Sequence, residues 1–330
     1  MIDPFVSKGV DFYRGKKVAV TGATGLIGSY AVKVLKESGA VVRAIVHERR
    51  TNEFCEMADE ICDHDLLSME EAEDAVSDMD VVIGCAGITG GVNLPKIDPV
   101  SYVGPASVLA MNTIHACWKF KVKRFGYLSS TTVYAPQDRP VREEDSELPG
   151  ELYPLYRGIG QSKRFLEKLC RYYHETTGLG VGVVRPAGAY GRFDNFDEKT
   201  SHVLPGMVER ARAYDRLNKF ECWGDGEDVR DFVHAQDVAR CLLMATALKP
   251  DATPFNVASG IGVSTRELAA TVLRAVGSDK EIVFNVTKPS ALKTRLVSIS
   301  RAQEQLGFMP EIALYEGVRD VVLWREEASQ

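Results

Sequence analysis

Three glycines near the start of the chain, Gly22, Gly25 and Gly28, stand at the spacing of a turn that binds phosphate groups. In such a turn the first glycine permits a tight reversal after a strand, the second lets the backbone approach a pyrophosphate, and the third lets the next helix pack closely on the sheet. The helix N-terminus adds N–H groups and a partial positive charge, which favour a bound anion. We therefore predict that a dinucleotide contacts Gly22, Thr24, Gly25, Leu26, Ile27 and Gly28.

The segments on either side of the glycines support this interpretation. Residues 16–20 form a short β-branched run, and apolar residues recur at helical spacing over residues 26–38, before Gly39. Residues 41–46 are apolar enough for a second buried strand. A strand, a helix and a strand within about 30 residues are the context in which such a glycine pattern indicates dinucleotide binding.

The alternation of strands and helices continues along the chain. Further strands are predicted at 60–62, 80–85, 124–129 and 180–185, with helices at 69–77, 101–120 and 160–176. Strands that alternate with helices favour a parallel sheet covered on both faces. The predicted fold class is therefore α/β, a Rossmann doubly wound parallel sheet.

Beyond Tyr190 the pattern changes to helical and loop segments (202–214, 235–248, 265–276) mixed with short strands such as 282–286. We interpret this half as a smaller C-terminal substrate-binding lobe. The predicted division is a dinucleotide-binding domain over residues 1–190 and a lobe over 191–330, with residues 233–258 returning to the first domain.

The residues after the second strand bear on the choice of cofactor. An acid there accepts the ribose hydroxyls of NAD, whereas arginine accommodates the additional phosphate of NADP. This chain reads His47-Glu48-Arg49-Arg50, in which Glu48 could bind a ribose while His47, Arg49 and Arg50 make the segment net positive. We therefore favour NADP(H), with His47 and Arg49 as contacts, and leave NAD(H) open.

Composition excludes several classes of protein. The 330 residues carry a net charge of −6 without a basic stripe, which argues against a nucleic-acid partner. No apolar run approaches the ~20 residues of a membrane helix. The seven cysteines are an odd number without a CxxC pair, as expected of reduced thiols in the cytoplasm, and no metal site is predicted. The acids Glu143, Glu144 and Asp145 are expected in an exposed loop.

Several motifs in the same order resemble the extended short-chain dehydrogenase/reductases, the NAD-dependent epimerase/dehydratase family. They are Thr21–Gly28 in the form TGxxGxxG, Asp65-Leu66, Leu128–Tyr134, Arg185–Gly191, and Trp223–Gly226 followed by Arg230–His234. Within the family, four further segments are most similar to the GDP-L-fucose synthases: Gly90-Gly91, Asp194–Phe196, Ser201–Pro205 and Lys288-Pro289. The resemblance runs over nearly the whole chain.

The resemblance implies roles on the cofactor side of the site. Asp65 and Leu66 would contact the adenine, and Ala86 would lie beside the cofactor after the fourth strand. Lys163 would bind the nicotinamide ribose and lower the pKa of a neighbouring acid through its charge. Pro186 and Ala187 would line the nicotinamide.

On the substrate side, the resemblance implies a nucleotide-linked sugar. Ser130 would bond to the sugar oxygen that undergoes redox, and Arg230 would pair with the diphosphate. His202 would protonate a carbon during epimerisation, and Asn195 and Trp223 would contact the substrate. The family also implies a homodimer through the helices predicted at 101–120 and 160–176.

The chain departs from the family at its defining acid. The family has tyrosine four residues before the lysine, as YxxxK, whereas here Ile159 stands four residues before Lys163. Thr132 stands where the fucose synthases have a cysteine base, and Gly188 where the family usually has asparagine. Tyr156, seven residues before Lys163, could substitute if the helix begins early; alternatively the protein uses another acid.

The sequence thus favours an enzyme for redox or epimerisation of a nucleotide-linked, GDP-type sugar. The catalytic candidates are Ser130, Thr132, Tyr156, Lys163 and His202. The alternative is a non-catalytic protein that binds the dinucleotide or nucleotide sugar and has a sensing or scaffolding role.

Overall fold

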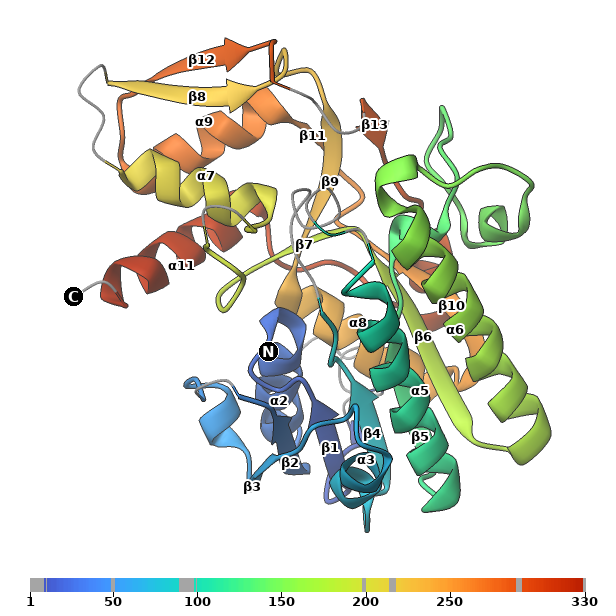
Figure 1. Cartoon of the computed structure of the whole chain (residues 1–330). Helices are drawn as coiled ribbons and strands as arrows, with labels where there is room; N and C mark the ends of the chain where they lie inside the picture. Colours follow the sequence, from blue (N-terminus) through green and yellow to red (C-terminus); the bar gives the residue numbers. More distant parts are fainter. Residues whose placement is uncertain are drawn as a thin grey trace.

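A seven-stranded, all-parallel sheet forms the larger part of the protein, as a computed structural model shows (Figure 1). The structure describes residues 9, 11–48, 51–88, 98, 100–197, 200–213, 218–288 and 293–328. In spatial order the strands are β10 (Asp251–Val257), β6 (Gly180–Pro186), β5 (Arg124–Leu128), β4 (Val81–Gly84), β1 (Lys17–Thr21), β2 (Val41–Val46) and β3 (Glu60–Asp63). The order reverses between β1 and β4, as in doubly wound folds.

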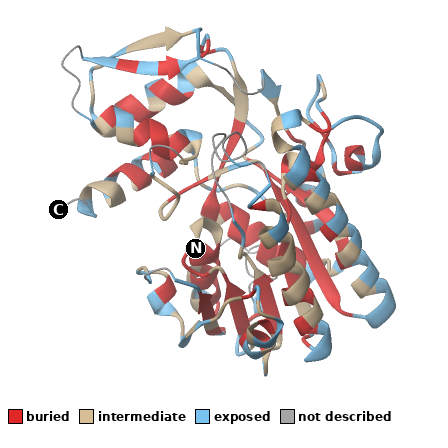
Figure 2. Ribbon diagram, in the orientation of Figure 1, coloured by how far each residue is buried: buried red, intermediate tan, exposed pale blue. Residues whose placement is uncertain are grey.

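Helices cover both faces of this sheet, because consecutive residues of its central strands are apolar and so both faces are apolar. Val18 and Val20 of β1 belong to the core shared with α2 (Leu26–Glu37) and α8 (Ala235–Leu248), and α10 (Ser300–Leu306) adds to it. Ala19 points into the opposite core, beneath α3 (Met69–Val76), α5 (Val103–Lys119) and α6 (Arg157–Thr177). The strands are accordingly among the most buried parts of the chain (Figure 2).

A second lobe begins after the carboxyl end of β6. After Ala187 the chain forms β7 (Gly188–Tyr190), which pairs with β9 (Val229–His234); β9 also pairs with β11 (Gly262–Ser264) and β13 (Thr294–Arg295). A separate pair, β8 (Lys219–Trp223) and β12 (Glu281–Asn285), lies with α7 (Val203–Arg212), α9 (Thr265–Val276) and α11 (Leu314–Glu327) around a third core. Strand β9 ends where α8 begins, so the chain returns from this lobe to the large sheet at His234 (Figure 1).

The α/β prediction is confirmed, and several elements have the predicted bounds. Strand β2 and helices α8 and α9 begin and end where the sequence placed them. Helix α6 instead begins at Arg157, three residues before the predicted start, because the short 3-10 helix η4 (Pro154–Tyr156) leads directly into it. The other 3-10 helices are η1 (Cys55–Met57), η2 (Thr131–Val133) and η3 (Glu143–Glu147).

Two further observations concern the described part of the chain. None of its helices combines the length and the apolar character required to cross a membrane. All seven cysteines are free thiols, five of them buried, and the described residues hold no cluster of three or more metal-ligating side chains.

Candidate active site

The glycine turn after β1 has the close contacts that its sequence requires. Gly22 has a φ of +63°, and a Cβ on it would lie 2.7 Å from the Cα of Ala86 at the end of β4. A Cβ on Gly28 would lie 2.1 Å from the carbonyl oxygen of Gly22. No larger residue fits at either position without a backbone shift. The turn therefore brings Ala86 and the first turn of α2 together, and the amide of Ala86 donates to Thr21 Oγ1 at 3.1 Å.

The N-terminus of α2 is built to receive an anion. Gly25 is the N-cap residue and has no side chain to cap the helix, and the first turn holds no acid. The first α-helical bond runs from the amide of Ser29 to the carbonyl of Gly25, so the amides of Leu26, Ile27 and Gly28 precede it. Gly25 has ordinary extended backbone, and a Cβ there would lie 3.2 Å from the carbonyl oxygen of Gly22. This cradle fits the diphosphate of a dinucleotide.

Asn52, which the sequence did not point to, fixes the turn from the other side. Its side-chain amide donates to the carbonyl of Thr24 at 3.3 Å and to Ser29 Oγ at 3.0 Å, while its Oδ1 accepts the amides of Phe54 and Cys55. Thr24 is itself buried. The loop after β2 is thus tied to the dinucleotide cradle through one side chain.

The predicted cofactor contacts after β2 and β3 lie at the same edge of the sheet. His47 is half-exposed between two acids, with Nδ1 3.7 Å from Asp63 Oδ1 and Nε2 4.0 Å from Glu48 Oε1. Arg49 lies outside the described residues. Leu66 is buried and its carbonyl accepts the side-chain amide of Asn112, whereas Asp65 Oδ1 accepts the amide of Leu67.

Lys163 on α6 is directed at the end of β5. Its Nζ donates to the carbonyl of Leu128 at 2.8 Å and lies 5.0 Å from the centre of the Tyr127 ring. Burial lowers the pKa of Lys163 to about 8. At the end of the neighbouring strand β6, Pro186 is buried and the amide of Ala187 bonds to the carbonyl of Val257. The Nζ of Lys163 at the end of β5 and the residues Pro186 and Ala187 at the end of β6 therefore lie at the same edge, on adjacent strands.

A buried polar network holds this part of the site. Glu167, one turn after Lys163, accepts bonds from Ser129 Oγ and from the Arg185 guanidinium. Arg185, 2% exposed, also donates to the Tyr134 hydroxyl and to the carbonyl of Glu143.

The expectation that Glu143 and Asp145 are exposed is wrong. Both are buried, because the carboxylate of Glu143 accepts the amide of Asn256 and Asp145 forms an ion pair with Arg139. Glu144 alone of the three is exposed.

Ser130 and Thr132 follow β5, Ser130 as the N-cap residue of the short helix η2 and Thr132 within it. Ser130 Oγ accepts the amide of Thr132 at 3.1 Å, and Thr132 Oγ1 is buried with no hydrogen-bond partner among the described residues. Gly160 lets α6 approach this segment, since a Cβ there would lie 2.4 Å from the carbonyl oxygen of Thr132. Thr132 consequently lines one cavity with Tyr156, Tyr153 and Arg295.

Tyr156 occupies the N-cap position of α6 rather than a position inside the helix. Its ring centre lies 5.8 Å from Cζ of Arg295 and 5.9 Å from the ring of Tyr153. Burial raises the pKa of Tyr156, while the charges of Arg295 and Arg230 oppose that rise. Lys163 instead interacts electrostatically with Glu167, Cys170 and Cys85. Tyr156 therefore lies near Arg295 and Arg230. The position four residues before Lys163, on the first turn of α6, belongs to Ile159.

Arg230 and Arg295 are partners in register on the adjacent strands β9 and β13. Side chains at paired positions lie on the same face of a sheet, so the two cations are neighbours. Burial lowers the pKa of Arg230 and lowers that of Arg295 to about 10. Like charges opposite one another destabilise a sheet, and the charge of Asp228 partly offsets this by favouring the charged form of Arg230. The sequence did not single out Arg295, because the two-residue strand β13 carries no recognisable periodicity.

His202 forms a pair with a buried acid. It is the N-cap residue of α7, and its Nδ1 lies 2.8 Å from Oδ1 of Asp194, whose other oxygen is buried without a hydrogen-bond partner among the described residues. Burial lowers the pKa of His202, but the hydrogen bond and the charge of Asp194 outweigh burial and raise it above its ordinary value.

The two remaining substrate candidates differ in their surroundings. The side-chain amide of Asn195 donates to Thr200 Oγ1, and its oxygen accepts the amide of Asp197, so both groups are used within its own loop. Trp223 ends β8 with 40% of its surface exposed, and Nζ of Lys288 lies 5.7 Å from its ring centre.

The parallel sheet and the glycine cradle define an α/β protein of the dinucleotide-binding class. The model of the NAD dependent epimerase/dehydratase family matches residues 18–258, and the chain belongs to this family of nicotinamide-dependent enzymes.

Named relatives cover nearly the whole chain. It is 27% identical over 320 residues to the GDP-L-fucose synthase of Escherichia coli (strain K12), with 94% of this chain and 96% of that protein covered. It is 28% identical over 324 residues to a dTDP-4-dehydro-6-deoxy-D-allose reductase of Streptomyces sp, with 95% and 97% covered. The fold matches the crystal structure of a GDP-L-fucose synthetase from Naegleria fowleri bound to NADP, with a TM-score of 0.80, 21% identity, and 96% and 95% of the two chains covered.

Proposed function

We propose that this protein catalyses nicotinamide-dependent redox or epimerisation of a nucleotide-linked sugar, and that the nucleotide is GDP. The observation that carries the proposal is the register pairing of Arg230 with Arg295 beside Tyr156. Two neighbouring guanidinium groups suit the oxygens of a diphosphate, which would offset their mutual repulsion. The GDP-L-fucose synthase from Escherichia coli, similar along its whole length, supports the choice of sugar class.

We propose NADP(H) as the cofactor. The bound nicotinamide would supply or accept the hydride. Leu26, Ile27 and Gly28 would hold the diphosphate through their amides, and Lys163 would bind the nicotinamide ribose while Pro186 and Ala187 line the ring. Asp65, Leu66 and Ala86 would contact the adenine half, and His47 with Arg49 would meet the ribose phosphate. The Naegleria fowleri relative with bound NADP supports this preference.

The active site is proposed to work without the usual tyrosine, because Ile159 has no proton to transfer. Ser130 would bond to the reacting sugar oxygen. His202, whose pKa the hydrogen bond and charge of Asp194 raise, would donate the proton in its imidazolium form. Tyr156 and Thr132 would contact the substrate beside Arg295, since they line one cavity with it. Asn195 would shape the loop before His202, and Trp223 would contact the nucleotide.

The proposal is tested by NADPH oxidation with purified protein and a GDP-linked keto-sugar, with the dTDP-linked sugar for comparison. We expect turnover with the GDP sugar and a loss of about 100-fold or more in Lys163→Ala. Unchanged turnover in Lys163→Ala would contradict the assigned site.

A second function is favoured by Ile159 itself: the protein could bind the cofactor and the nucleotide sugar without turnover, as a sensor or scaffold. Calorimetry separates the two. The binding role would be established if both ligands bind tightly without NADPH oxidation, and if Tyr156→Phe and His202→Gln leave their affinities unchanged.

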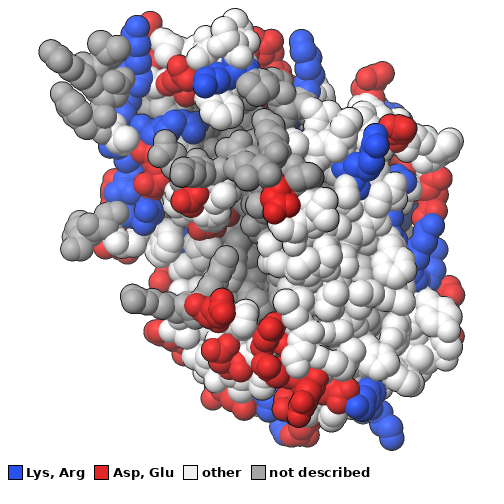
Figure 3. Space-filling model, in the orientation of Figure 1, with Lys and Arg blue, Asp and Glu red and all other residues white. Residues whose placement is uncertain are grey.

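We also propose a homodimer formed by α5 and α6, in a reducing cytoplasmic setting that suits seven free thiols. Helix α5 holds no charged residue before Lys119, and Phe165 and Tyr172 of α6 are 53% and 61% exposed. A wide uncharged surface covers these helices (Figure 3). Light scattering should give twice the chain mass for the native protein and the single mass for Phe165→Asp with Tyr172→Asp.

A further inference from the structure

A second cavity lies at the edge of the large sheet opposite the glycine turn. Its volume is about 780 Å³, within the range of small-molecule sites. It is lined by residues that precede β1, β4, β5 and β6, and by the last residues of α5 and α6. Since the strands are parallel, the amino-terminal edge holds this cavity and the carboxyl edge holds the candidate active site. The cavity is therefore separate from that site, and the inference below does not rest on the proposed function.

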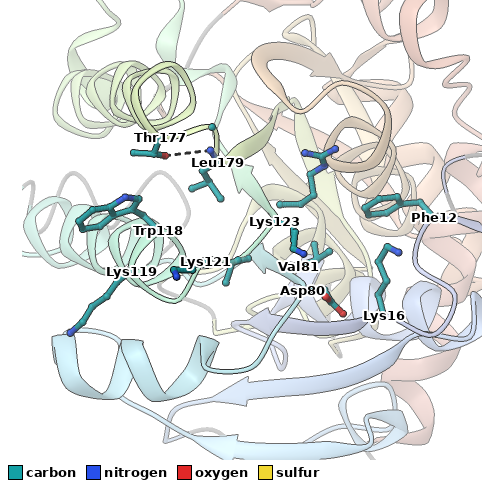
Figure 4. A pocket seen from close by; sticks show the side chains of 13 residues that line it. Phe12, Lys16, Asp80, Val81, Trp118, Lys119, Lys121, Lys123, Thr177 and Leu179 are labelled. Carbon is teal, nitrogen blue, oxygen red and sulfur yellow. Dashed lines mark hydrogen bonds between the residues drawn. The ribbon is translucent and has the colours of Figure 1, made fainter.

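The cavity is cationic although the chain as a whole is acidic, with a net charge of −6. Lys16, Lys121, Lys123 and Arg124 line it. The ion pairs described at this edge instead join Lys17 to Asp78 and Lys119 to Glu73. Nε of Arg124 is buried without a hydrogen-bond partner among the described residues. Lys119 is directed away to Glu73 on α3, at 2.6 Å, and so does not contribute (Figure 4).

The charges that oppose these four cations do not balance them. Asp80 is the acid in the lining, and its carboxylate accepts the amide of Lys17. The carboxyl ends of α5 and α6 add about −0.5 each. About two positive charges remain. A phosphate monoester carries nearly two negative charges near pH 7 and would balance them.

Aromatic rings stand at the two ends of the cavity, with Lys121 and Lys123 between them (Figure 4). Lys16 lies over the Phe12 ring at 4.8 Å, so that ring already has a partner. The rings of His115 and Tyr173 lie 5.1 and 6.5 Å from that of Trp118, which is still 46% exposed and offers this exposed surface for stacking. A planar ring joined to a phosphate would satisfy the indole and the cations together. We propose that this cavity binds a nucleoside monophosphate.

Calorimetry of the full chain saturated with NADP(H), which would occupy the glycine-turn site, tests the proposal with AMP and with inorganic phosphate as probes. Lys121→Glu and Lys123→Glu, both at exposed positions, should each weaken AMP binding about tenfold or more. Arg319→Glu, a matched charge reversal at an exposed position of α11, should leave it within about twofold. Phosphate should bind about tenfold more weakly than AMP, and Trp118→Ala should remove that difference.

Three results would overturn the proposal. AMP affinity unchanged in both lysine variants would show that the cavity does not bind the phosphate. Loss of AMP binding in Arg230→Ala instead would place the ligand in the candidate active site. Equal affinity for phosphate and AMP in the native protein would show that no nucleoside is recognised.

Discussion

Nδ1 of His202 lies 2.8 Å from Oδ1 of Asp194, an acid whose side chain is 3% exposed. The pair raises the pKa of His202 above the ordinary value of 6.5. We predict that turnover falls as the pH rises through this raised pKa, because the imidazolium is the proposed proton donor. The ring resonances of His202 in an NMR titration and the pH profile of kcat should give the same midpoint.

Asp194→Asn is the matched variant for this pair. It should shift both midpoints to lower pH, because it removes the charge that favours the imidazolium. The same pair should stabilise the fold fully below pH 6.5, and that contribution should disappear as the pH rises through the folded-state pKa. A pH profile of kcat that does not move in Asp194→Asn would assign the proton to another group.

Gly25→Glu should abolish cofactor binding and leave the fold intact. Gly25 has a negative φ, and a Cβ there would meet the Gly22 carbonyl oxygen at 3.2 Å, so a shift of a few tenths of an ångström makes room for a side chain. The added carboxylate would occupy the anion cradle and repel a diphosphate. Calorimetry with NADP(H) and thermal unfolding should be measured together. Retained binding in this variant would refute the assignment of the cradle.

The affinity for NADP(H) should fall as the pH rises through about 8, the pKa of Lys163. The ammonium form has three N–H donors, one of which bonds to the Leu128 carbonyl and two of which are left for a ribose, and its charge attracts the cofactor phosphates. Lys163→Met should bind the cofactor more weakly and lose this pH dependence. If the native protein and Lys163→Met show the same pH dependence, the lysine does not bind the cofactor.

Ile159→Tyr should raise kcat about tenfold or more, because it restores a proton donor four residues before Lys163. Residue 159 lies on the first turn of α6 and is half-buried, so the larger ring has room toward solvent. Tyr156→Phe serves as the comparison and should mainly raise the KM of the sugar. A large loss of kcat in Tyr156→Phe would instead make Tyr156 the acid.

The sequence predicted the large sheet well because its elements are long and strongly patterned. Strand β2 is a six-residue buried run and α9 carries a Ser264–Glu267 capping box, so their bounds were correct. Strands β11 and β13 hold three and two residues, too few for any period to emerge. Strand β10 contains Pro254 and begins with an irregular register, which hid the edge of the sheet.

The sequence predicted the site residues that lie in a local motif, but it did not predict those that distant strand pairing brings together. The glycine cradle is a local motif, whereas Arg295 meets Arg230 across 65 positions of sequence through a strand pairing. The burial of Glu143 depends on Asn256 and Arg301, both far along the chain, so its local sequence resembled an exposed loop. Tyr156 is the N-cap residue of α6, and it lies near Arg295 and Arg230, which stand on strands far along the chain.

The central claim is that Arg230 and Arg295 together hold the diphosphate of a nucleotide sugar, and a double-mutant cycle on the KM of the GDP-linked sugar tests it most directly. Arg230→Ala and Arg295→Ala should each raise that KM about tenfold or more. The double variant should raise the KM by less than the product of the two single effects, and the affinity for NADP(H) should not change in any of the variants. A KM that stays at the native value in both single variants would contradict the account.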